Sequence, residues 1–155
     1  MDQEFRLATL EEKEIVKQLL MEYSRELYKY ERVPSSKFAS AQCFDDYWIE
    51  HKRFPFIAIQ KENVAGICLL RDTCESYSID EFYIKTKYRR IGLGRKFVQF
   101  IVDFCRKDEK HKEIYANSLV DNLLAKWFWN SAGFRTKEIQ EAGKERFFIN
   151  IKKIN

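Results

Sequence analysis

A strand-like apolar stretch that turns through a basic, glycine-spaced loop into a helix is the strongest constraint on how this chain folds. Residues 76–85 read as a strand, and after the loop apolar residues recur at helical spacing, at Gly94, Phe97, Val98, Ile101, Val102 and Cys105. The loop contains Gly92 and Gly94, two of only five glycines in 155 residues. Glycines leave backbone amides accessible, and a helix N-terminus attracts anions. The segment therefore predicts a strand–loop–helix unit that binds a phosphate-bearing ligand.

The order of the other predicted elements indicates one sheet flanked by helices. Further strands are expected at residues 5–9, 56–60, 64–70, 113–118, 134–140 and 146–151, with hairpin turns at 61–63 and 142–143. Helices are expected after a Thr9 cap, with an apolar stripe from Ile15 to Leu27, and at 38–53, 94–105 and 121–132. Strand–helix–strand units imply parallel pairing and hairpins imply antiparallel pairing. We therefore expect a single mixed α/β domain over residues 1–155.

Composition excludes several classes of protein. A hydrophobic content of 45% and an aromatic content of 15% exclude a disordered chain, and no apolar run approaches the roughly 20 residues of a membrane span. The acidic start, from Met1 to Glu4, lacks a signal-peptide core. Neither the four cysteines nor the two histidines have the spacing of metal ligands. We expect a soluble, cytoplasmic protein with reduced thiols, no membrane partner and no metal.

The formal net charge of +4 comes from one patch, because residues 82–102 hold six Lys or Arg residues and no Asp or Glu. A general nucleic-acid binder carries basic residues across a whole face, with aromatic platforms between them. Here the basic residues instead bracket two glycines at a helix start. We therefore expect a small polyphosphate ligand and no nucleic acid, and a basic nucleic-acid-binding domain is the least favoured alternative.

Two sequence blocks resemble the motifs of the GNAT superfamily of N-acetyltransferases. Arg89-Arg90-Ile91-Gly92-Leu93-Gly94 is similar to the family's acetyl-CoA motif, which is Gln or Arg, two residues, Gly, one residue, and Gly or Ala. Residues 122–134 are similar to its Asn-x-x-Ala-x-x-Phe-Tyr-x-x-x-Gly-Phe signature. The resemblance covers nearly the whole chain. It implies a central, mixed, mostly antiparallel sheet of about seven strands with about four helices, and acetyl-CoA as donor without a metal.

The resemblance also implies which residues bind the donor. Backbone amides from Arg90 to Arg95 would hold the pyrophosphate, together with whichever of the Arg89, Arg90 and Arg95 side chains reach it. The preceding strand would line the pantetheine arm, and an amide there would stabilise the oxyanion. The implied donor-binding residues are Phe82, Tyr83, Ile84, Arg89, Arg90, Ile91, Gly92, Leu93, Gly94, Arg95, Asn122, Ala125, Phe128 and Trp129.

The second block departs from the family at one position. Trp129 replaces the tyrosine that is placed to protonate the departing thiolate, and an indole N–H cannot deliver a proton at neutral pH. Trp129 is expected to face the donor and Trp127 to lie in the core. Asn122 is interpreted either as a pantetheine contact or as a helix N-cap. The thiolate would leave unprotonated or take a proton from water, Tyr83 or Tyr88.

The candidate bases are Glu81 and Asp80, since transfer needs a neutral amine. Strand alternation predicts that their side chains point to opposite faces, and Glu81 is favoured. The alternative is that both carboxylates only pair with nearby Lys or Arg. Direct transfer in a ternary complex is expected, because nothing in the sequence indicates that Cys74 is activated as a nucleophile.

The acceptor is expected to be a small-molecule or peptide amine, contacted by the first two helices and the last hairpin. Aromatic residues beside acids suit a cation, although a core and a solvated face are the favoured explanation of these residues. These residues are Tyr23, Tyr28, Tyr30, Phe44, Asp45, Asp46, Tyr47, Trp48, Glu50 and His51. A non-catalytic acyl-CoA-binding module of the same fold is the main alternative function. A homodimer formed by strand pairing at residues 146–151 is a further hypothesis.

Overall fold

The computed structural model describes residues 2–28, 30, 43–142 and 145–155. The strands are β1 (Gln3–Leu7), β2 (Arg53–Gln60), β3 (Asn63–Asp72), β4 (Tyr77–Ile84), β5 (Glu113–Leu119), β6 (Arg135–Ala142) and β7 (Glu145–Lys153). The α-helices of this part of the chain are α1 (Lys13–Leu27), α3 (Leu93–Arg106) and α4 (Leu123–Ser131). Short 3-10 helices are η1 (Leu10–Glu12), η2 (Phe44–Trp48) and η3 (Thr86–Tyr88).

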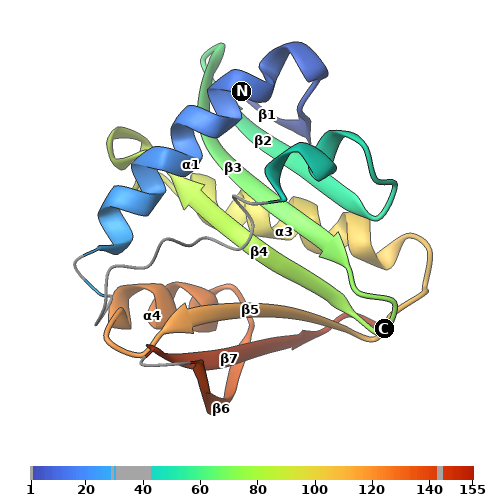
Figure 1. Cartoon of the computed structure of the whole chain (residues 1–155), viewed down its shortest axis with the longest axis vertical. Coiled ribbons are helices and arrows are strands. Elements are labelled where there is room, and N and C mark those ends of the chain that lie inside the picture. The colour runs from blue at the N-terminus through green and yellow to red at the C-terminus, as the bar shows by residue number, and fades with distance from the viewer. Residues whose placement is uncertain (1, 29, 31–42, 143–144) are drawn as a thin grey trace.

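The seven strands form one sheet in the order β1-β2-β3-β4-β5-β7-β6 (Figure 1). Every neighbouring pair is antiparallel except β4 with β5, which is parallel. The parallel pair is joined through α3, as a strand–helix–strand unit requires. The predicted mixed, mostly antiparallel sheet of about seven strands is therefore confirmed.

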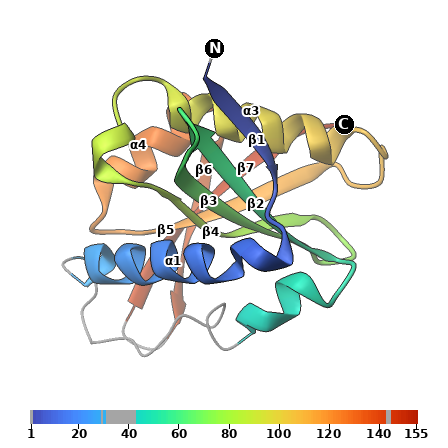
Figure 2. The same ribbon diagram turned by 90° about the horizontal axis from the view of Figure 1, so that it is seen from above.

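Helices cover both faces of the sheet, with α1 on one face and α3 and α4 on the other (Figure 2). The larger core lies beneath α3, where Phe97, Ile101 and Cys105 are fully buried against β2 to β5. A second core lies beneath α1 and contains Val16, Leu19 and Tyr47. The apolar faces of both amphipathic helices thus account for the two sides of the core.

The second predicted helix, residues 38–53, is only partly seen. Residues 38–42 lie outside the described residues, while Phe44–Trp48 forms the short helix η2. Arg53 and Pro55 belong to β2, so the prediction that the helical region extends to Arg53 is wrong. Pro55 directly precedes the segment of β2 that pairs with β1, and its carbonyl accepts from the Ala8 amide. A proline is tolerated where no ladder bond needs its missing N–H.

Strand β7 is an interior strand. Residues 147–153 pair with β5 on one side, and residues 145–151 pair with β6 on the other. The hypothesis that residues 146–151 pair across subunits therefore fails, because this strand has no free edge. The edge strand at this end of the sheet is β6. The turn predicted at residues 142–143 lies partly outside the described residues.

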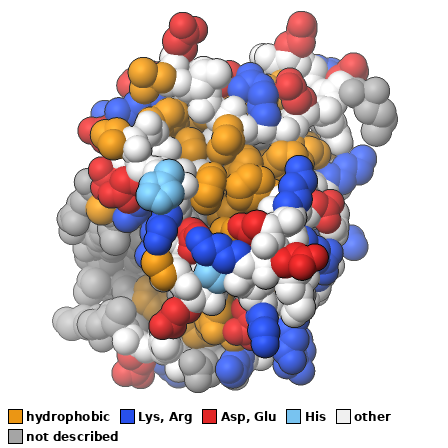
Figure 3. All heavy atoms as spheres, turned by 90° about the vertical axis from the view of Figure 1, so that its right-hand side faces the viewer, with side chains coloured by type: hydrophobic (Ala, Val, Ile, Leu, Met, Phe, Trp, Pro, Cys, Tyr) orange, Lys and Arg blue, Asp and Glu red, His pale blue; other side chains and the backbone are white. Residues whose placement is uncertain are grey.

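No helix within the described ranges is long and apolar enough to cross a membrane. In the same ranges, no group of three or more His, Cys, Asp or Glu side chains is arranged to hold a metal ion. Figure 3 shows hydrophobic side chains gathered between charged ones on the side of the molecule near the C-terminus. Half-buried phenylalanines at the edge of the larger core include Phe54, Phe100 and Phe104.

Candidate active site

Strands β4 and β5 are paired over only three residues each. Tyr77 to Ile79 pair with Ile114 to Ala116, after which β4 continues to Ile84 and β5 to Leu119. Figure 1 shows the two strands diverging beyond this point. Beyond the three paired residues the two strands have no ladder pairing with each other, and we call this split at the carboxyl end of the only parallel pair in the described sheet the β4–β5 opening. Openings of this kind are where α/β sheets bind ligands.

The loop that follows β4 is built on two left-handed residues, Arg90 with φ of 64° and Gly92 with φ of 80°. Gly92 is the N-cap of α3, and a β-carbon added to it would meet nothing within 4 Å. The first amides of a helix have no partner within it, so those of Leu93 and Gly94 are available at this end of α3. The geometry fits an anion at the helix N-terminus, as the sequence predicts.

Gly94 has a different role from Gly92. A β-carbon added to Gly94 would lie 3.1 Å from the ring of Phe128 in α4. The Phe128 ring also stacks on Phe82 of β4, with ring centroids 5.4 Å apart. The second glycine of the motif therefore allows α3, α4 and β4 to meet closely, and so brings both sequence blocks to the same place.

The arginines of the loop differ in orientation. Arg90 and Arg95 are exposed. The Arg89 guanidinium instead donates to the carbonyl of Ile84, at 2.8 Å, and to Glu26 of α1. Of the three arginines predicted to reach phosphates, Arg89 is already bound to the protein, which leaves Arg90 and Arg95. Ile91, at the tip of the loop, is exposed as well.

Strand β4 contains a β-bulge at Asp80. Leu69 of β3 pairs with Glu81, and Leu70 pairs with Ile79, so Asp80 is an extra residue in β4. Directly paired residues share a face of the sheet. Because Leu69 lies in the core beneath α1 and Leu70 in the core beneath α3, Glu81 faces α1. Glu81 is buried, with 9% of its surface exposed.

Asp80 faces α1 as well. Its carboxylate accepts hydrogen bonds from the hydroxyl of Tyr47, which lies in the core beneath α1, and from Arg71 and Ser78. The prediction that Asp80 and Glu81 point to opposite faces is therefore wrong, because the bulge interrupts the alternation. The four hydrogen bonds on Asp80 use the four lone-pair positions of a carboxylate, so Asp80 has a structural role. The candidate base is Glu81.

Two tyrosines near the site are held by carboxylates. Burial, and then the charge of Asp80, raises the pKa of Tyr47 far above its ordinary value. Tyr83 is buried and donates to Glu22 of α1 at 3.3 Å. Burial, and then the charge of Glu22, raises the pKa of Tyr83. Tyr83 is therefore a weaker acid than a free tyrosine and a poor replacement for the missing proton donor.

Helix α4 begins at Asn122, whose side chain accepts from the Ala125 amide at 3.1 Å. Of the two interpretations of Asn122, the N-cap is the one that the structure confirms. Trp129 is buried, and Ala125 is half-buried. The prediction that Trp127 belongs to the core is wrong, because 59% of its surface is exposed.

Trp129 lies in the core within an aromatic cluster. Its ring makes edge contacts with Phe82, Phe128 and Phe134, at centroid distances of 5.2, 5.1 and 5.1 Å. Phe82 belongs to the part of β4 that is not paired with β5, so Trp129 packs against this part of the strand. This environment is apolar, and it suits the packing of an indole ring better than the delivery of a proton.

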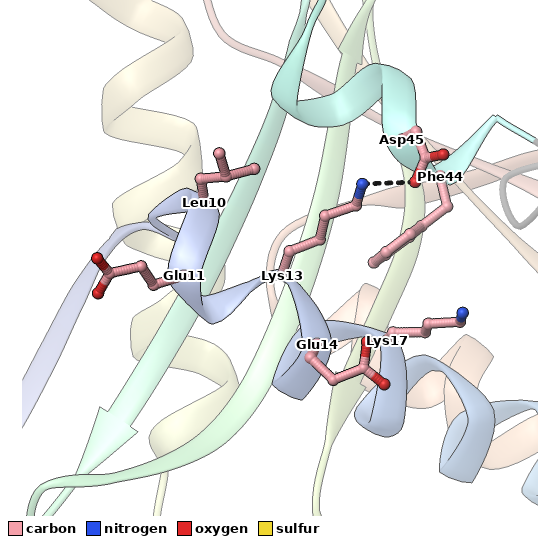
Figure 4. A pocket seen from close by; sticks show the side chains of 7 residues that line it. All are labelled: Leu10, Glu11, Lys13, Glu14, Lys17, Phe44 and Asp45. Carbon is pink, nitrogen blue, oxygen red and sulfur yellow. Dashed lines mark ion pairs between the residues drawn. The ribbon is translucent and has the colours of Figure 1, made fainter.

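The acids predicted for the acceptor side are largely paired within the protein. Asp45 pairs with Lys13 at 2.6 Å, and Glu50 pairs with Arg53 at 2.9 Å. A shallow pocket in this region lies between the N-terminal turn of α1 and η2 (Figure 4). The contact between α1 and the loop after β4, from Glu26 to Arg89, is made at the other end of the helix. This pocket is therefore separate from the opening between β4 and β5.

Three residues that organise the site, Arg71, Glu22 and Glu26, were not predicted from the sequence, and Tyr47 was predicted only as an acceptor contact. Tyr47 and Arg71 hold Asp80, and Glu22 and Glu26 hold Tyr83 and Arg89. Glu22 and Glu26 are four residues apart, so they occupy one face of the predicted helix. That spacing, together with the acid-free basic patch, is the one sequence signal that indicates such a contact.

Comparison with known proteins identifies the family. A profile described as an acetyltransferase (GNAT) domain matches residues 6–151. This chain belongs to the GNAT acetyltransferase family. No curated protein sequence matches it. The loop before α3 and helix α4 both lie within the matched residues.

Solved structures share the fold of this GNAT domain at low sequence identity. The ribosomal-protein-S18-alanine N-acetyltransferase of Escherichia coli has a TM-score of 0.75 and 15% identity, covering 98% of this chain and 94% of that one. The spermidine N-acetyltransferase of Vibrio cholerae, solved with CoA and spermine, has a TM-score of 0.76 and 13% identity, with 99% and 96% covered. The yncA protein of Salmonella typhimurium, solved with acetyl-CoA, has a TM-score of 0.75 and 13% identity, with 100% and 95% covered.

Proposed function

We propose that this protein is an acetyl-CoA-dependent N-acetyltransferase that transfers the acetyl group directly to a primary amine in a ternary complex. The observation that carries the proposal is the β4–β5 opening, because the part of β4 that is not paired with β5 contains the buried carboxylate of Glu81 and leads into residues 85–92, which we call the phosphate loop. A candidate base, a strand segment free to border the donor and a candidate anion site follow one another along the chain, and they match the three parts of the reaction.

The residues present fit the donor. Space is open at Gly92, the first amides of α3 are available, and Arg90 and Arg95 are exposed beside them. We propose that these groups hold the pyrophosphate and that Phe82, Tyr83 and Ile84 border the pantetheine arm. Acetyl-CoA supplies an activated thioester. Amide donors of the unpaired half of β4 would stabilise the negative charge that develops on the carbonyl oxygen.

Glu81 is proposed to accept the proton of the attacking ammonium, directly or through a water molecule. The amine nitrogen then forms a bond to the carbonyl carbon. As the tetrahedral intermediate collapses, the bond from that carbon to sulfur breaks and the nitrogen loses its second proton to water. Trp129 has no proton to give, and Tyr83 is held by Glu22. The thiolate is therefore proposed to leave as an anion and to take its proton from solvent, which a thiol pKa near 8.5 permits.

The acceptor class is proposed only as far as a primary amine. A spermidine N-acetyltransferase and a protein-alanine N-acetyltransferase both share this fold, so polyamines and peptide N-termini are the first acceptors to test. The fold alone does not choose between them.

The test combines calorimetric titration with acetyl-CoA and a thiol-release assay. The acceptor panel contains polyamines, aminoglycosides, amino acids and lysine peptides. Binding of acetyl-CoA with amine-dependent thiol release supports the proposal and gives the acceptor class. Binding without release from any amine favours the alternative, an acyl-CoA-binding module, for which the buried Trp129 in place of a tyrosine is the specific observation. A failure to bind acetyl-CoA contradicts both.

A further inference from the structure

Arg89 opens the phosphate motif in sequence, but its side chain makes three contacts inside the protein. Its Nε donates to the carbonyl of Ile84 at 2.8 Å. Its Nη2 donates to both carboxylate oxygens of Glu26, at 2.8 and 3.1 Å. The guanidinium carbon also lies 5.4 Å from the ring centroid of Tyr83. Arg89 thereby joins the end of β4, the start of the phosphate loop and helix α1.

Helix α1 offers two carboxylates on the face that meets this region. Glu26 holds Arg89, while Glu22, one turn earlier, accepts from Tyr83 and lies 3.7 Å from the ammonium of Lys85. Residues four apart share one side of a helix. The last turns of α1 are therefore tied to the strand and loop over the short span from Tyr83 to Arg89.

The charges in this arrangement explain why Glu26 is present beside an anion-binding loop. A free carboxylate near a pyrophosphate would weaken binding by repulsion. Arg89 Nη2 donates to both oxygens of Glu26 and so neutralises it, while Nε of the same planar guanidinium donates to the Ile84 carbonyl, which fixes the Arg89 side chain at both ends. The amides from Arg90 to Arg95 follow directly in the chain, so their position depends on where Arg89 is held.

We propose that Glu26 and Arg89 form a positioning pair that orients the phosphate loop from helix α1, and that Arg89 is not itself a phosphate ligand. The inference rests on the proposed function, since it concerns binding of the same donor. It adds a residue outside both sequence blocks, Glu26, to the set that determines donor affinity.

The test measures the Kd of CoA by calorimetry for wild type, Glu26→Gln, Arg89→Gln and the double variant. Glutamine at residue 89 can still donate to Ile84 but loses the ion pair. We expect each single variant to weaken CoA binding by roughly three- to tenfold, in line with a partly exposed charged pair. We expect the double variant to bind no more weakly than Arg89→Gln alone, because both changes remove one interaction.

The matched control is Glu14→Gln, which removes the same charge from the exposed face of α1. Its Kd should equal that of wild type. Arg95→Gln gives the behaviour of a phosphate contact, namely weaker binding that depends less steeply on NaCl concentration. Glu26→Gln should retain the salt dependence of wild type, since the phosphate contacts are unchanged. If Glu26 only stabilised the fold, Glu26→Gln would lower the melting temperature without changing the Kd of CoA.

Glu26→Gln is the decisive variant. If Arg89 were a phosphate ligand held back by Glu26, removing the carboxylate would free it, and CoA would bind more tightly. Unchanged or tighter binding by Glu26→Gln, while wild type binds CoA, overturns the inference and leaves the proposed function intact. A wild-type protein that does not bind CoA overturns both.

Discussion

The Arg71 guanidinium binds both oxygens of the Asp80 carboxylate, at 2.9 and 3.2 Å, on the strand residue next to Glu81. This ion pair separates the roles of two adjacent acids. Asp80→Asn should lower the free energy of unfolding by about 2 kcal/mol, because Arg71 loses its charged partner. Urea unfolding checks this value. Full stability of Asp80→Asn, combined with lost turnover, would contradict a structural role for Asp80.

Glu81→Gln should lower kcat by about a hundredfold, the usual contribution of a general base, without weakening CoA binding. Steady-state assays with the acceptor found in the panel give kcat, and calorimetry gives Kd. The pH profile is the sharper measurement, because without the base the reaction depends on acceptor amine that is already neutral, so kcat of Glu81→Gln should keep rising with pH toward the pKa of that amine. An unchanged profile would mean that another group accepts the proton.

Trp129→Phe should retain kcat within about threefold, since the indole is not expected to deliver a proton. It should cost about 1 kcal/mol of stability through lost ring contacts with the surrounding phenylalanines. Thermal melts and kcat measure the two effects. Trp127→Phe is the matched control on the same helix and should change neither, because Trp127 is exposed. A large loss of kcat in Trp129→Phe would show that the indole N–H acts in the reaction.

The two glycines of the motif, Gly92 before α3 and Gly94 in its first turn, should respond differently to alanine. Gly92→Ala places a β-carbon on a residue with φ of 80°, which costs about 1 kcal/mol and should weaken CoA binding. Gly94→Ala should be nearly neutral, because the gain in helix propensity of about 1 kcal/mol offsets the close contact with Phe128. Melting temperatures and calorimetric Kd values test both. Gly94→Val should be clearly destabilising, and equal effects of Ala at both positions would refute the distinction.

Glu12 should contribute stability that is lost in acid. Two hydrogen bonds from Arg6, and a further one from the Thr9 amide, lower the pKa of Glu12 to about 2 against an ordinary value of 4.5. The folded pKa is below the unfolded one, so the contribution is complete above pH 4.5 and disappears as the pH falls through about 2. Glu12→Gln should cost about 1 kcal/mol at pH 7 and nothing near pH 2.

Urea unfolding at both pH values checks the Glu12 prediction. Glu11→Gln, the neighbouring exposed acid, should follow wild type throughout. If the free energy of unfolding changed with pH in the same way for Glu12→Gln and wild type between pH 7 and pH 2, the lowered pKa of Glu12 would not be the source of the stability.

Local patterns predicted most of the fold. The hairpin at Lys61 and Glu62 closes with both residues at positive φ, and β2 and β3 flank it as expected. Gly133 ends α4 in a left-handed conformation, at φ of 94°. These features depend on neighbours in sequence, so one chain is enough to predict them.

The errors have long-range causes. The bulge at Asp80 depends on how β4 pairs with β3, and no residue of β4 indicates it. Trp127 and Trp129 have the same type of side chain, and the packing of α4 against Phe82 and Phe134 decides which is buried. Arg89 matches the phosphate motif, while the Glu26 that holds it lies 63 residues earlier. Partner choice at such separations is a property of the assembled fold.

Strands β4 and β5 pair over only three residues, so their carboxyl-terminal halves lie in the middle of the sheet without pairing to each other. A donor molecule bound there would contact both strands and stabilise the folded state, by about 2.7 kcal/mol at a concentration of a hundred times its Kd. The lifetime of the protein against proteases should then increase with acetyl-CoA concentration. Abundance inside a cell would follow the supply of its own substrate, without any dedicated regulator.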